Sequence, residues 1–371
     1  VLDYVKYKEA CDKLRDINIE VIYEERISDD FNEICDTLLG IKLIYVNDPI
    51  NALKLVFSKL YKYALCICFA SQGHLECLKY LHENGCLWHS STCYMAAQNG
   101  HLECLKYARE NGCQLGWETC FYAALGGHLD CLKYARENGC PWDALTCSNA
   151  AMKGHLDCLK YANENNCPWD VLTCSSAAWN GHLECLQYAH ENNCPWDALT
   201  CSNAAKNGHL DCLKYARENG CSWNALTCRY AALNGHLDCL KYAHINGCLW
   251  DSDTCDYAAQ RGNLDCLKYA HENNCPWDGF TCTTAAYSGH LDCLKYLHEN
   301  GCPWDEGTCF DAASGGRLNC LKYAYENGCP VPRDWHCNDS ECWTYIKFIK
   351  RKQVRKIMKP LRRLSKRMRK N

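Results

Sequence analysis

The sequence lacks the features that would place it in several large classes of protein. Its longest apolar run, Tyr63–Ala70, is far shorter than the roughly 20 residues that span a bilayer. Charges interrupt residues 1–26, so no secretory leader is expected and the protein is predicted to be intracellular, in the cytoplasm or nucleus. There is no glycine-rich phosphate loop and no Gly-x-Ser-x-Gly elbow, so neither catalysis nor a cofactor is expected.

Acidic residues are absent from residues 347–371, which hold 13 Lys and Arg. The other 346 residues hold 27 Lys and Arg against 44 Asp and Glu, a net charge of −17. An acidic body therefore carries a basic tail. The basic residues that we single out in this tail are Lys350, Arg351, Lys352, Arg355, Lys356, Arg362, Arg363, Lys366 and Arg367.

A glycine recurs every 27 residues through most of the chain. One copy of the unit spans Thr146–Leu172. A fixed period of this length is typical of a solenoid, a single elongated domain in which each unit contacts only its neighbours. The sequence therefore predicts about ten units, whose chemistry must be sought in the residues that differ between copies. The marker glycines are Gly73, Gly100, Gly127, Gly154, Gly181, Gly208, Gly235, Gly262, Gly289 and Gly316.

Each unit is predicted to be a helix-turn-helix hairpin. Asp143 is a suitable N-cap for a first helix, on which a Cys and two Ala share one face. Gly154 should end that helix in the left-handed conformation, and a second helix should run from His155 to Asn165. The residue after this Asn is Gly or Asn in every copy, which predicts a second left-handed cap. A Trp in each connector is expected to cover the joint between hairpins, at Trp142, Trp169, Trp196, Trp223, Trp250, Trp277 and Trp304.

The repeated motif Thr-x-x-x-Ala-Ala-x-x-Gly-His-Leu-Glu-Cys-Leu-Lys-Tyr-x-x-Glu-Asn-Gly resembles the ankyrin repeat over residues 65–333. It departs from that family in length, because an ordinary ankyrin repeat has about 33 residues. This short form, rich in Cys and Trp, is similar to repeats of large DNA viruses and of some protists. The resemblance implies an all-α, ankyrin-like solenoid with shortened β-hairpin loops. It also implies a non-enzymatic scaffold that binds a partner protein through its first helices, such as a viral host-interaction protein or adaptor.

Four positions on the first helix change freely between copies. They face away from the repeated Cys and Ala, and in the ankyrin family the first helix lines the concave groove. Exposed aromatic side chains with interspersed charge suit a protein-binding hot spot, although tolerated surface drift is the alternative. The candidate partner-binding residues are Tyr94, Phe121, Tyr122, Trp179, Arg229, Tyr230, Asp256, Tyr257, Tyr287 and Phe310.

The sequence holds 35 cysteines, and 29 of them fill three positions of the repeat. Equivalent cysteines of adjacent units are expected to be too far apart to be joined, since packed helices lie roughly 8–10 Å apart. We therefore interpret them as reduced thiols in the core, with disulfides as the alternative. Zinc is not expected because no Cys-x-x-Cys occurs, although His74 with Cys77 is one weak candidate. A second weak candidate is the group Cys329, His336, Cys337 and Cys342.

The two ends of the chain lie outside the repeat. Residues 1–64 are expected to form a helical cap, with helices at Asp29–Leu39 and Pro49–Tyr63, and Leu65–Gln72 resembles a degenerate first helix. Residues 334–371 should form a C-terminal cap and a basic amphipathic helix that Pro360 kinks or interrupts. The tail has three interpretations: it binds nucleic acid, in which case the protein is a nucleic-acid- or virion-associated structural protein; it lies on an anionic membrane; or it docks on the acidic body.

Overall fold

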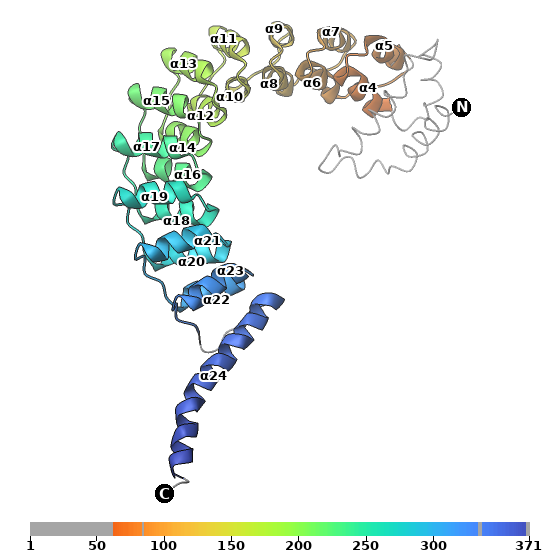
Figure 1. Ribbon diagram of the computed structural model, residues 1–371. Coiled ribbons are helices and arrows are strands. Elements are labelled where there is room, and N and C mark those ends of the chain that lie inside the picture. Colours follow the sequence, from red (N-terminus) through yellow and green to blue (C-terminus); the bar gives the residue numbers. More distant parts are fainter. Residues whose placement is uncertain (1–61, 84, 333–335, 369–371) are drawn as a thin grey trace, which may run out of the picture. The chain divides into compact units, whose positions relative to one another are not determined.

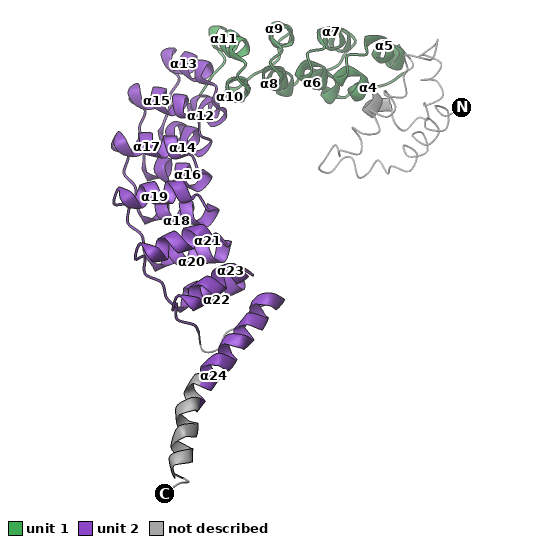
Figure 2. Cartoon of the chain, viewed as in Figure 1, with its two compact units in different colours: residues 1–169 green, residues 170–371 purple. Residues whose placement is uncertain are grey.

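The structure is a computed structural model that describes residues 62–83, 85–332 and 336–368. The chain divides into two compact units, residues 1–169 and residues 170–371 (Figure 2). The described part of each unit is a stack of helical hairpins, and it contains no β-strand (Figure 1). The predicted all-α array is confirmed, whereas the predicted helices at Asp29–Leu39 and Pro49–Tyr63 lie outside the described residues, apart from the last two of the second. The domain bounds 1–64, 65–333 and 334–371 stay a prediction.

The described part of the first unit, from residue 62 on, holds four hairpins. Their first helices pack side by side in one row, and their second helices form another row. The first helices are α4 (Lys62–Ser71), α6 (Ser90–Gln98), α8 (Trp117–Gly126) and α10 (Ala144–Lys153). The second helices are α5 (Leu75–Glu83), α7 (Leu102–Glu110), α9 (Leu129–Glu137) and α11 (Leu156–Glu164). The degenerate first helix predicted at Leu65–Gln72 is confirmed as α4.

The second unit, where the structure describes it, holds six hairpins and a long final helix, α24 (Ser340–Met368). Its first helices are α12 (Val171–Asn180), α14 (Ala198–Lys206), α16 (Ala225–Asn234), α18 (Ser252–Arg261), α20 (Gly279–Ser288) and α22 (Glu306–Ser314). Its second helices are α13 (Leu183–Glu191), α15 (Leu210–Glu218), α17 (Leu237–Ile245), α19 (Leu264–Glu272), α21 (Leu291–Glu299) and α23 (Leu318–Glu326).

The core is built from small side chains between two helix rows. On α14, Cys201, Ala204 and Ala205 are fully buried, and the short Ala side chains let neighbouring first helices approach closely. Each second helix contributes at least one fully buried Leu, such as Leu213 of α15. Most first helices begin where a side chain caps them, as Asp143 does by accepting a hydrogen bond from Leu145 N at 3.0 Å. The predicted N-cap at Asp143 is therefore confirmed.

The two glycine positions of the repeat differ in what they contact. Gly208 has φ +79°, and a Cβ placed on it would lie 2.5 Å from the ring of His236 in the next hairpin. Gly220, after the second helix, has φ +86°, and a Cβ there would meet nothing within 4 Å. The first position therefore needs a left-handed residue without a side chain, whereas the second needs only the left-handed conformation. This is why Asn166 and Asn193 can occupy the second position, with φ of 61° and 64°.

The histidine after the marker glycine ties each hairpin to the one before it. His236 hydrogen-bonds the carbonyl of Lys206, at the end of the preceding first helix, while burial lowers the pKa of its ring. Where the histidine is replaced, the new side chain makes the same kind of contact. Asn263 Nδ2 donates to the carbonyl oxygens of Ala232 and Leu233, both at 2.9 Å. The repeated Gly-His pair thus joins neighbouring hairpins.

The Trp of the connector covers the joint between hairpins, as predicted. The ring of Trp196 stacks on His190 with centroids 3.8 Å apart and meets Tyr215 of the next hairpin edge-on at 6.3 Å. His190 Nδ1 lies 3.0 Å from the Tyr215 hydroxyl oxygen. Where an Arg replaces this His, its planar guanidinium takes the same place, as Arg217 does at 4.3 Å from the Trp223 ring.

Cysteines pair within a hairpin rather than between hairpins. The Cys120 thiol on α8 hydrogen-bonds Cys140 in the following connector, and this contact together with burial raises the pKa of Cys120. Burial also raises the pKa of Cys131, on the second helix, to about 12, so these buried thiols stay protonated at neutral pH. The same pairs recur at Cys93–Cys113, Cys174–Cys194, Cys201–Cys221, Cys228–Cys248, Cys255–Cys275, Cys282–Cys302 and Cys309–Cys329.

The corresponding pair of the first described hairpin is Cys66 and Cys86, whose Cα atoms lie 7.5 Å apart. This separation exceeds the roughly 7 Å that a disulfide spans without backbone movement. The reduced state of Cys86 therefore stays a prediction. That prediction rested on the distance between equivalent cysteines of adjacent units, whereas Cys86 meets a cysteine at a different position of its own hairpin.

The final helix continues past its proline. Pro360 was expected to kink or interrupt the basic helix, yet α24 runs as one element from Ser340 to Met368. The predicted interruption is therefore wrong, whereas the predicted kink stays a prediction.

Candidate functional site

The variable positions bring aromatic rings together on the first helices of the first unit. The rings of Tyr94 on α6 and Tyr122 on α8 stack with centroids 4.7 Å apart. Phe121 meets Tyr122 edge-on at 4.9 Å, and Trp117 meets Phe121 edge-on at 5.6 Å. We call these four side chains the aromatic patch. Three of them were singled out from the sequence.

The fourth, Trp117, was missed, although it is 46% exposed at the start of α8. It lies outside the four variable positions. The available signal was that most other copies carry Ala or another small residue there, such as Ala198 and Ala225. A bulky ring at a position that is otherwise small indicates a local surface feature.

In the second unit, a lysine bridges two of the predicted aromatic residues. Lys206 Nζ of α14 lies 4.6 Å from the ring of Trp179 on α12 and 5.1 Å from the ring of Tyr230 on α16. A cation between two rings is attracted by the electron density of both faces. This trio, which we call the Trp-Lys-Tyr bridge, spans three consecutive first helices. Lys206 occupies a variable position but was not singled out.

The next predicted residue, Arg229, forms ion pairs within the same surface. Its guanidinium contacts the carboxylates of Asp251 and Asp253, the latter at 2.9 Å. These carboxylates hold the pKa of Arg229 above its usual range, with the hydrogen bond to Asp251 as the largest cause. The charge of Arg229 is therefore already compensated by two acidic residues of the following hairpin.

Asp256 is not on the surface as its variable position led us to expect. It is only 7% exposed, and Thr281 Oγ1 donates to its Oδ1 at 2.5 Å. Burial raises the pKa of Asp256 to about 6, and nearby carboxylates add to the shift while the Thr281 hydrogen bond opposes it. Asp256 therefore contributes mainly to the packing of α18 against α20.

The remaining predicted residues do not form one cluster. Tyr257 on α18 is half-buried, whereas Tyr287 on α20 is 55% exposed and Phe310 on α22 is also exposed. Exposed Phe280, at the start of α20, was missed because it too lies outside the four variable positions. The structure thus divides the predicted set into an aromatic patch, a Trp-Lys-Tyr bridge, an ion-paired Arg229, a buried Asp256 and separate exposed rings.

The structure places the residues of the two weak zinc candidates in other contacts. His74 and Cys77 belong to positions that serve the joint and the core in the other repeats. His336 lies against Trp343, with ring centroids 4.7 Å apart. Within residues 62–83, 85–332 and 336–368, no group of three or more His, Cys, Asp or Glu side chains is arranged to hold a metal ion. In the same stretches, no helix is long and apolar enough to cross a membrane.

The stacked hairpins and their sequence identify the family. A model for ankyrin repeats in three copies matches residues 65–144 and 228–308, and a model for ankyrin repeats in many copies matches residues 201–244. Together they cover just over half of the chain. The chain belongs to the ankyrin-repeat family. Ankyrin repeats are generally non-catalytic binding modules, and they typically act as protein-protein interaction scaffolds.

Among solved structures, this ankyrin-repeat chain is similar to the crystal structure of the human ASB11 ankyrin repeat domain. The two are 20% identical, the match covers 42% of this chain and 84% of that chain, and the TM-score is 0.38. No curated protein matches the chain.

Proposed function

We propose that this ankyrin-repeat protein is a non-catalytic scaffold whose partner protein binds the surface of the first helices. One observation carries the proposal. The side chains that vary between repeats meet one another across neighbouring first helices, as Tyr94 meets Tyr122 and as Trp179 meets Tyr230 through Lys206. A surface of Trp, Tyr and Arg side chains is enriched in the residue types that dominate protein-protein binding energy.

The second helices support this choice of surface by contrast. Their outward residues are repeated from copy to copy, as in α9 and α15, which both read Leu-Asp-Cys-Leu-Lys-Tyr-Ala-Arg-Glu. Exposed i,i+3 pairs such as Lys106 with Glu103 are a general feature of solvated helices. A surface that is identical in every hairpin does not fix the position of a partner along the array. The surface of the first helices differs from one hairpin to the next, so it can fix that position.

The test replaces Tyr230 and Tyr257 with Ala in the full chain. Crosslinking and pull-down from cells of the native host should recover at least one partner with the unchanged protein and about tenfold less with the variant, as expected for loss of two aromatic hot-spot side chains. A matched control changes the second-helix row, with Lys214→Ala and Glu218→Ala, and should recover the partner fully. Equal recovery with both variants would contradict the proposal, provided that both melt at the same temperature as the unchanged protein.

The proposed context rests on the repeat form. The similarity of the Cys- and Trp-rich unit to repeats of large DNA viruses and protists supports a role as an intracellular host-interaction protein or adaptor. The pull-down above addresses this role too, because an adaptor must bind at least one cellular protein.

A further inference from the structure

The first half of α24 is fixed to the last ankyrin hairpin. Ile346 and Ile349 are fully buried, and so is Cys342. The Asp339 carboxylate accepts a hydrogen bond from Cys342 N at 2.8 Å, which caps the start of the helix. The helix is therefore held in one orientation against α23, and its opposite face is open to solvent.

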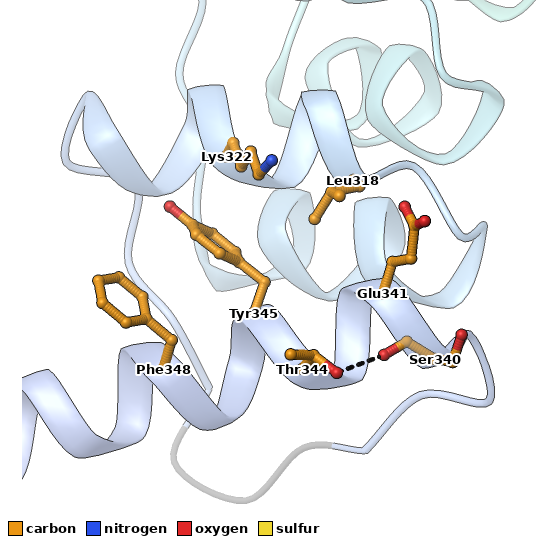
Figure 3. A pocket seen from close by; sticks show the side chains of 7 residues that line it. All are labelled: Leu318, Lys322, Ser340, Glu341, Thr344, Tyr345 and Phe348. Carbon is orange, nitrogen blue, oxygen red and sulfur yellow. Dashed lines mark hydrogen bonds between the residues drawn. The ribbon is translucent and has the colours of Figure 1, made fainter.

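A pocket of about 520 Å³ lies between α23 and the start of α24 (Figure 3). Phe348 at one end of it is 51% exposed, and its ring stacks on Tyr345 with centroids 5.7 Å apart. Tyr345 in turn meets Tyr325 of α23 edge-on at 6.2 Å. An exposed ring supported by packed rings is a platform on which a nucleobase stacks. The lining residues are Leu318, Lys322, Ser340, Glu341, Thr344, Tyr345 and Phe348.

Lysine side chains surround these rings. Lys322 Nζ lies 5.8 Å from the centre of the Tyr345 ring, and Lys352 Nζ lies 5.5 Å from the centre of the Tyr325 ring. Lys352 is exposed, so its ammonium group can approach a phosphate beside the platform. Aromatic rings interleaved with cations are the two components of a surface that binds single-stranded nucleic acid.

The face of α24 that lines the pocket continues as a basic stripe. Helical spacing from Thr344 and Phe348 leads to Arg351, Lys352 and Arg355. All three are exposed, and none forms an ion pair within the part of the chain that the structure describes. No acidic residue follows Glu341 in α24, and the sequence repeats a basic residue at the same spacing at Lys359, Arg362 and Lys366.

We propose that this stripe binds a single strand of nucleic acid. An unpaired base stacks on Phe348 at the pocket, and the sugar-phosphate backbone follows Arg351, Lys352 and Arg355 along the helix. A single strand is favoured over a duplex because a paired and stacked base has no free face for Phe348. The stripe presents one apolar ring among cations, and binding to an anionic membrane, which would use the exposed Val354 and Met358 of the same helix, is an outcome of the test below.

Two carboxylates set the direction of the strand. Glu341 lines the pocket, and the Tyr345 hydroxyl donates to Glu326 Oε1 at 3.4 Å. Their negative charge repels phosphate at the pocket end of the stripe, so this end takes the base and the basic end takes the backbone. The change Glu341→Gln should therefore tighten binding by a few-fold, and a weaker complex would contradict this arrangement.

The experiment measures fluorescence anisotropy of a labelled 12-nucleotide oligo-dT with the full chain. Binding should weaken as salt rises. The triple change Arg351→Gln, Lys352→Gln and Arg355→Gln should lower affinity at least tenfold and reduce the slope of log K against log salt by about 2, since each phosphate contact on a single strand contributes about 0.7. Phe348→Ala should lower affinity about tenfold and leave that slope unchanged, because a stacking contact releases no counterion.

Controls separate this site from other sources of attraction. Lys214→Gln, Lys241→Gln and Lys268→Gln on the second-helix row remove the same charge and should leave binding unchanged. A 12-base-pair duplex should bind at least tenfold more weakly than the single strand. Absence of binding, equal binding of the duplex, or an unchanged affinity for Phe348→Ala would overturn the proposal. So would tighter association with phosphatidylserine vesicles than with oligo-dT. The assay contains no protein partner, so its failure would leave the scaffold proposal standing.

Discussion

The two helix rows of each unit differ in what their sequences hold constant. The second helices repeat nearly every residue, and these residues supply a buried Leu and Cys and the Tyr that meets the connector Trp. The first helices repeat only their buried Thr, Cys and Ala, while their outer positions change from Phe121 and Tyr122 to Arg229 and Tyr230. One row therefore builds and joins the hairpins, and the other row also presents a surface.

The difference shows which positions the fold requires. In a solenoid each unit contacts only its neighbours, so the contacts between units are the same in every copy. The side chains that make these contacts are therefore the same in every copy. Positions that change between copies are free of that requirement. The comparison predicts that substitutions in the second row act on stability, whereas substitutions on the outer face of the first row act on binding.

The largest effect should come from the buried leucine of the second row. Leu213 is fully buried on α15, and Leu213→Ala removes apolar contacts and leaves a cavity. We expect the free energy of unfolding to fall by about 3 kcal/mol. Urea unfolding followed by circular dichroism measures it. The matched change on the first row, Leu199→Ala, removes the same atoms from a side chain that is 46% exposed and should cost less than about 1 kcal/mol. Equal losses would erase the distinction between the rows.

A smaller effect is expected at the two glycine turns, one within a hairpin and one after its second helix. Gly208→Ala and Gly220→Ala both place a side chain at positive φ, which costs roughly 1–2 kcal/mol. Only the first also directs a Cβ into the His236 ring, so it should be the more destabilising by at least about 1 kcal/mol. Gly220→Asn should cost less than either, since Asn166 already occupies this position of another hairpin. The same loss for both alanine variants would show that the His236 contact carries no energy.

Much of the fold could be predicted from the sequence because the same pattern of residues recurs in about ten units. The N-cap at Asp143, the left-handed Gly154 and the Gly or Asn cap after each second helix follow from local backbone chemistry, and all are confirmed. The Trp ladder followed from its place in the connector. These features involve residues close in sequence, so a single copy contains most of the information.

Other features depend on which residues meet in space, and periodicity could not supply that. The Cys120–Cys140 contact joins two different positions of one hairpin, whereas a repeat period relates only equivalent positions. The bridge through Lys206 needs three successive helices, and the burial of Asp256 depends on Thr281 in the next hairpin. The variable positions stand out in the sequence as a set, but their individual environments are properties of the stack.

The smallest and most specific effect concerns Asp256, a buried charged residue at a variable position of the first row. Its pKa of about 6 in the folded protein exceeds the ordinary aspartate value near 3.9. The folded state therefore binds more protons than the unfolded state between these values, and Asp256 lowers the stability increasingly as pH rises through 6.

Asp256→Asn keeps an oxygen that can accept from Thr281 and removes the charge. We expect the variant to be about 1 kcal/mol more stable at pH 7, with the gain fading towards pH 4, a value reduced because water still screens part of the carboxylate. Urea unfolding of both proteins at pH 7 and pH 4.5 measures the difference. A variant that is less stable than the unchanged protein at pH 7 would contradict the destabilising effect of this charge.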